Sequence, residues 1–151
     1  MIRRWMLLSA TGLALALLAR GEPAPLSRYA TVAVGPARTS IYIGSVSLTM
    51  PVFTRQAGSY ATTYVAKVFP YFFYNEKGKL WIDFSDDDLR RLERGETVNF
   101  TGHASSEDGD ERRIEGRTEP VDDRSGKIKV RVFVSKRIEL IFNTTYRFSP
   151  K

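Results

Sequence analysis

The chain has 151 residues, no cysteine and one histidine, and its formal charge is +6. One domain is the organisation expected at this length. The lack of cysteine excludes disulfides and thiol nucleophiles, and a single histidine cannot supply the several nitrogen or sulfur ligands of a zinc site.

Residues 1–21 have the three parts of a secretory signal peptide. Arg3 and Arg4 make a basic start, an apolar run of 14 residues extends from Met6 to Ala19, and small residues follow at the end. We therefore expect export to the periplasm or the exterior, with cleavage near Gly21. An uncleaved anchor is the weaker alternative, because a bilayer span needs about 20 mostly apolar residues. The general secretory and twin-arginine routes both remain open.

Cleavage would change the charge of the protein. Arg3, Arg4 and Arg20 leave with the signal and no acidic residue does, so the formal charge falls from +6 to +3. A charge this small gives little support to nucleic-acid binding, and we expect no nucleic-acid partner.

The mature chain is predicted to open with a flexible lead-in over residues 22–38, which hold three prolines and little periodicity. A single β-rich domain is expected over 39–149, where β-branched and aromatic residues alternate between turn signals. Its first strands are predicted at Ile41–Met50, with Gly44 as a bulge, at Ser59–Phe69, and over the alternating residues Leu80, Ile82 and Phe84.

One short helix follows these strands in the prediction. Ser85 is a suitable N-cap, Asp86, Asp87 and Asp88 suit the positive end of the helix dipole, and Gly95 can end the helix. Further strands are expected at Thr97–Ala104, Glu111–Glu119, Lys127–Val134 and from Ile138 to Phe148. About seven strands with one helix indicate an all-β fold, either an antiparallel β-barrel or a two-sheet sandwich.

Alternation predicts that Ile128, Val130 and Val132 face inward, and it places Phe142 on one face of the last strand. Inward residues of this size could either fill a small barrel or line a lipid pocket.

The densest unusual feature is the aromatic run from Phe69 to Tyr74. A strand buries only every second side chain, so five aromatic residues in six positions cannot all enter one core. One interpretation divides them between the core and a covered patch. The other makes Tyr71, Phe73, Tyr74 and the nearby Trp81 a ligand-binding surface, because exposed apolar patches usually mark binding sites.

A basic surface is the second candidate. Lys127, Lys129 and Arg131 alternate along one strand, and Arg112 lies on the strand before it. Such a row is often only the solvated face of a strand. If the strands are adjacent, the cations could instead form a peripheral contact with an anionic surface.

Catalytic groups are sparse. His103 is predicted to face solvent from its strand, and no serine has the context of a nucleophile. Asp83 and Glu139 could serve a hydrolase only if another carboxylate shares their cleft. The acidic turn Glu107–Glu111 lacks the spacing of a calcium loop. We therefore expect no catalytic residue, no metal and no cofactor.

These observations favour an exported, non-catalytic binding module for a small apolar or carbohydrate ligand or a protein partner. A structural or assembly subunit of the cell envelope is the alternative, and a carboxylate-dependent hydrolase is the weakest of the three.

Overall fold

The computed structural model describes residues 26–150, so the predicted signal peptide lies outside the described residues. Ten strands, one α-helix and two short 3-10 helices make up the described chain. In order they are η1 (Leu26–Tyr29), β1 (Thr31–Val34), β2 (Ala37–Ile41), β3 (Gly44–Thr49), β4 (Phe53–Gln56), β5 (Ser59–Phe69), η2 (Phe72–Tyr74), β6 (Glu76–Asp83), α1 (Asp86–Glu93), β7 (Val98–Ser106), β8 (Glu111–Pro120), β9 (Ser125–Phe133) and β10 (Glu139–Ser149).

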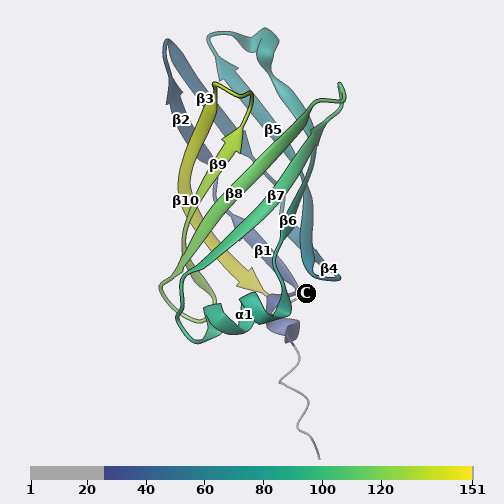
Figure 1. Ribbon diagram of the computed structural model, residues 1–151, viewed down its shortest axis with the longest axis vertical. Coiled ribbons are helices and arrows are strands. Elements are labelled where there is room, and N and C mark those ends of the chain that lie inside the picture. The colour runs from purple at the N-terminus through teal and green to yellow at the C-terminus, as the bar shows by residue number, and fades with distance from the viewer. Residues whose placement is uncertain (1–25, 151) are drawn as a thin grey trace, which may run out of the picture.

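Eight of the strands close into an antiparallel barrel (Figure 1). The ring runs β5-β4-β1-β10-β9-β8-β7-β6, and β6 pairs back to β5. Closure brings the first and last strands of the described residues together, because Val32 of β1 lies opposite Phe148 of β10. The all-β prediction is confirmed, and the structure is an antiparallel barrel rather than a two-sheet sandwich.

The remaining strands, β2 and β3, extend one side of the wall beyond β1 and β4. They form a hairpin with each other, and β3 pairs with the second half of β5, whose first half pairs with β4. The flexible lead-in predicted for residues 22–38 is therefore wrong from Leu26 onward, because this segment forms η1, β1 and the start of β2. The strand predicted at Ile41–Met50 is also wrong at its start, since the chain turns between Ile41 and Gly44.

The two ends of the barrel differ. The base, where η1, α1 and the β4–β5 and β8–β9 turns lie, is closed by side chains. Tyr29 and Leu89 are completely buried there, and the Tyr60 hydroxyl donates a hydrogen bond of 2.7 Å to the Tyr29 carbonyl. The rim is the opposite end, where the β2–β3, β5–β6, β7–β8 and β9–β10 connections lie (Figure 1).

The helix α1 forms as its sequence predicts. Ser85 Oγ accepts from the Asp88 amide, and the Asp88 carboxylate accepts in return from the Ser85 amide, which satisfies two otherwise unpaired donors. Gly95 follows with φ +81°, a conformation that favours glycine. The two leucines of α1, Leu89 and Leu92, are buried against the core, so the helix covers the base.

Candidate ligand-binding cavity

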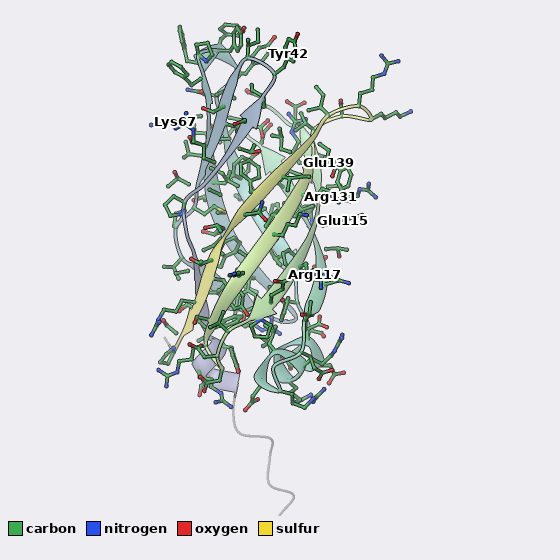
Figure 2. All side chains as sticks on the ribbon, turned by 90° about the vertical axis from the view of Figure 1, so that its left-hand side faces the viewer. Tyr42, Lys67, Glu115, Arg117, Arg131 and Glu139 are labelled. Atoms are coloured by element: carbon green, nitrogen blue, oxygen red, sulfur yellow. The ribbon has the colours of Figure 1, made fainter. Side chains whose placement is uncertain are left out.

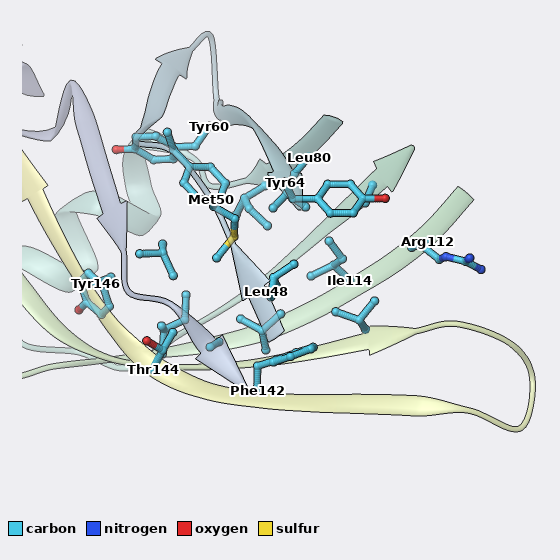
Figure 3. Close-up of a pocket in the computed structure, with 18 of the residues that line it drawn as sticks. Leu48, Met50, Tyr60, Tyr64, Leu80, Arg112, Ile114, Phe142, Thr144 and Tyr146 are labelled. Carbon is cyan, nitrogen blue, oxygen red and sulfur yellow. The ribbon is translucent and has the colours of Figure 1, made fainter. Parts of the chain in front are cut away.

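Strand alternation directs one face of every barrel strand inward, and the inward residues surround an apolar cavity (Figure 3). Its volume is about 130 Å³. Its walls extend from Phe84 and Phe148 near the base to Val134 near the rim. Most of the lining side chains are aliphatic or aromatic, among them Leu48, Ala66, Leu80, Ile114, Val130 and Phe142.

A small polar cluster lies among the lining residues toward the rim. Glu76 accepts hydrogen bonds from the Tyr64 hydroxyl at 2.7 Å and from the Arg112 guanidinium at 2.9 Å. Arg112 also donates to the Val134 carbonyl at 3.0 Å. The side chains of Glu76 and Arg112 are only 19% and 20% exposed, so this ion pair is largely removed from solvent.

The cluster shifts the ionisation of its members. Burial, followed by the hydrogen bond to Glu76, raises the pKa of Tyr64, and the phenol stays protonated. The hydrogen bond to Glu76 raises the pKa of Arg112 further above its usual value. The cavity is thus apolar along its length and carries one fixed group of polar contacts at the rim end.

The predicted aromatic site is divided by the fold. Tyr71, Phe73 and Tyr74 meet at the rim, with the Phe73 and Tyr74 ring centroids 4.6 Å apart. Trp81 lies elsewhere, about 17 Å along β6 from Glu76 at roughly 3.3 Å per residue. It is on the outer wall, where its ring stacks on His103 with centroids 4.7 Å apart. The structure therefore brings three of the four predicted residues together and leaves Trp81 out.

Only three of the four residues predicted for the basic surface lie on the outer wall. Lys127, Lys129 and Arg131 are exposed on the outside of β9, but Arg112 belongs to the cavity wall. Acidic neighbours interrupt the row, because Arg131 pairs with Glu139 (Figure 2) and the adjacent Arg117 pairs with Glu119. The outer wall at β8–β10 is therefore a mixture of both signs of charge.

Asp83 and Glu139 lie far from each other, although Asp83 shares an open surface hollow with Asp88, whose carboxylate caps α1. His103 is exposed on the outer wall, as predicted. Asp83 ends β6 near the base, whereas Glu139 begins β10 near the rim, and three strands separate β6 from β10 in the sheet. Within residues 26–150, no three His, Cys, Asp or Glu side chains gather where they could hold a metal ion.

The sequence left open whether the inward residues fill a small barrel or line a pocket, and sequence reasoning missed the pair Glu76 and Arg112. A signal for Arg112 exists, because it is two residues before the inward-facing Ile114 and so shares its side of the strand. Glu76 has a weaker signal, since residues 75–79 resemble a turn in the sequence, whereas Glu76 begins β6.

The fold and the cavity together define a small, closed antiparallel β-barrel with an apolar interior. No protein-family model, curated protein or solved structure matches the chain. Between residues 26 and 150, no helix is both long and apolar enough to cross a membrane.

Proposed function

We propose that this protein is an exported, non-catalytic binding module that holds a small apolar molecule inside the barrel. The observation that carries the proposal is the apolar cavity enclosed by the ring of strands. Eight-stranded barrels are just wide enough to be filled by side chains or to hold one small ligand. An engineered apolar cavity of about 150 Å³ takes up benzene, so this volume suits a single ring or a short acyl segment.

The lining also favours an apolar ligand over a carbohydrate. A sugar brings many hydroxyl groups into the cavity, and each needs a hydrogen-bonding partner when it leaves water. The polar groups of the wall are few, and three of them, Tyr64, Glu76 and Arg112, already bond to one another. The ligand that fits is a hydrocarbon with at most one polar end, which would face this cluster.

Titration calorimetry with hexanol, octanol and decanol tests the proposal. Each added CH₂ group that enters an apolar site contributes about 0.8 kcal/mol. We expect one binding site whose affinity rises about fourfold per CH₂ until the cavity is full. Absence of binding by all three alcohols, or an affinity independent of chain length, would contradict the proposal.

A cavity-filling variant provides the matched control. Val130→Phe places a larger side chain in the cavity, whereas Val65→Phe makes the same change on the outer face of β5, where Val65 is 40% exposed. Binding should be lost in the first variant and retained in the second, with both still folded by circular dichroism.

Export is the second part of the proposal and rests on residues 1–21 of the sequence. The mass of the protein recovered from the envelope and medium of its host tests it. A mass that lacks these residues is expected, and recovery of the full-length chain from the cytosol would overturn it.

A further inference from the structure

Two neighbouring loops at the rim expose six large apolar side chains. Tyr42 and Ile43 form the β2–β3 turn, Phe69 ends β5, and the other three lie between β5 and β6. Their exposed fractions range from 62% to 101%, and the set is Tyr42, Ile43, Phe69, Phe72, Phe73 and Tyr74. We call these six residues the rim apolar patch. Side chains of this size are rarely exposed together unless they contact a partner.

The two loops form one surface because their backbones touch. A Cβ atom on Gly44 would lie 1.9 Å from the Phe69 carbonyl oxygen, so only glycine allows the loops to come this close. The β5–β6 loop is also fixed internally, since the Val68 amide donates to Asn75 Oδ1 at 2.8 Å and the Asn75 amide donates to the Phe72 carbonyl at 3.0 Å. The patch is therefore held in place before any partner arrives.

Charge is absent from both loops and present around them. No charged residue occurs from Thr39 to Thr54 or from Val68 to Asn75. The exposed cations Lys67, Lys136 and Arg137 lie at the same end of the barrel. An acidic turn, Glu107–Asp110, also lies at the rim, beyond the β5–β6 loop in the ring of strands.

We propose that the rim apolar patch inserts into the interface of a lipid bilayer. The two loops that carry the patch extend from the end of the barrel (Figure 1), and Tyr42 lies at that end in Figure 2. A protruding uncharged surface suits a deformable partner such as lipid. Phenylalanine and isoleucine side chains enter the boundary between headgroups and acyl chains, and tyrosine favours a position with one apolar and one wet side. The barrel tilts so that the patch enters and the acidic turn stays in water.

Vesicle cosedimentation tests this docking, with the mature protein and vesicles of phosphatidylcholine alone or mixed equally with phosphatidylglycerol. Insertion of apolar side chains predicts binding to both kinds of vesicle, with binding that persists at high salt. The Phe72→Ser/Phe73→Ser variant should bind about a hundredfold more weakly, tenfold for each phenylalanine removed.

Val121→Ser is the control variant, because Val121 is 73% exposed but lies in the β8–β9 turn at the base. It should bind as the unaltered protein does, and all variants should keep the same melting temperature. The cavity-filling Val130→Phe variant should also bind vesicles, because membrane docking does not require a ligand in the cavity. The two proposals can therefore fail separately.

Two results would overturn the inference. The first is that the unaltered protein does not bind vesicles, and the second is that the double serine variant binds them equally well. If vesicle binding is absent and the protein forms a concentration-dependent dimer that the double serine substitution dissociates, the patch contacts another copy of this chain.

Discussion

Glu76 joins three strands at the rim end of the cavity. It lies on β6 and accepts hydrogen bonds from Tyr64 on β5 and Arg112 on β8. A largely buried guanidinium is costly unless a carboxylate compensates its charge. Asp110 cannot replace Glu76 in this role, because its carboxylate is 61% exposed and 3.7 Å from Arg112.

We therefore expect Glu76→Gln to lower the free energy of unfolding by about 1–3 kcal/mol, the usual cost of leaving a buried polar group unsatisfied. The matched control is Glu107→Gln, which breaks an ion pair with Lys77 whose side chains are both more than 60% exposed. Exposed pairs contribute about 0–1 kcal/mol. Urea unfolding measures both variants, and equal effects would show that the buried cluster does not stabilise the rim.

The elements differ in how far the sequence predicts them. The N-cap, acidic first turn and terminal glycine of α1 are all local signals, and the helix forms where they place it. The β2–β3 hairpin has only Gly44 as a signal, which fits a bulge as well as a turn. What decides between them is the distant Phe69, whose carbonyl oxygen leaves no room for a side chain at Gly44.

This packing makes the β2–β3 hairpin sensitive to one methyl group. Gly44 has φ +146° and contacts the β5 backbone, whereas Gly58 has φ +83° and open space around it. Gly58→Ala should cost only the strain of a left-handed residue, about 1–2 kcal/mol. Gly44→Ala should cost more, because β3 must also move away from β5.

Thermal unfolding ranks the two alanine variants, and hydrogen exchange locates the damage. We expect faster exchange at the β3–β5 pairing in Gly44→Ala and unchanged exchange there in Gly58→Ala. Equal melting temperatures for the two variants would mean that the close contact at Gly44 does not add to the loss of stability.

Barrel closure is a property of the whole molecule that the sequence does not reveal. The alternation in β9 and β10 correctly predicts which residues face inward, including Ile128, Val130 and Phe142. Whether the sheet closes around them depends on the pairing of β1 with β10, in which Val34 lies opposite Tyr146, more than 100 residues away. The cavity could not be predicted because no local pattern specifies such long-range register.

Three buried tyrosines along the barrel give the whole molecule a common response to alkaline pH. Tyr60, Tyr64 and Tyr146 are 2%, 5% and 3% exposed. Burial is the main cause that raises the pKa of each, and it raises the pKa of Tyr146 to about 12. Folding therefore favours the protonated phenols. Their full contribution to the free energy of unfolding is present below pH 10, which is the ordinary pKa of tyrosine.

As the pH rises from 10 toward 12, the unfolded chain loses these protons and the folded barrel retains them. The free energy of unfolding should fall by up to about 1.4 kcal/mol per pH unit for each tyrosine. Tyr146→Phe keeps the ring and removes one ionisable group, so its stability should fall less steeply over this range. Every other ionisable group is common to the two proteins, so the decisive quantity is the difference between their two slopes, measured by urea unfolding. Identical slopes would show that Tyr146 ionises as readily in the barrel as in the unfolded chain.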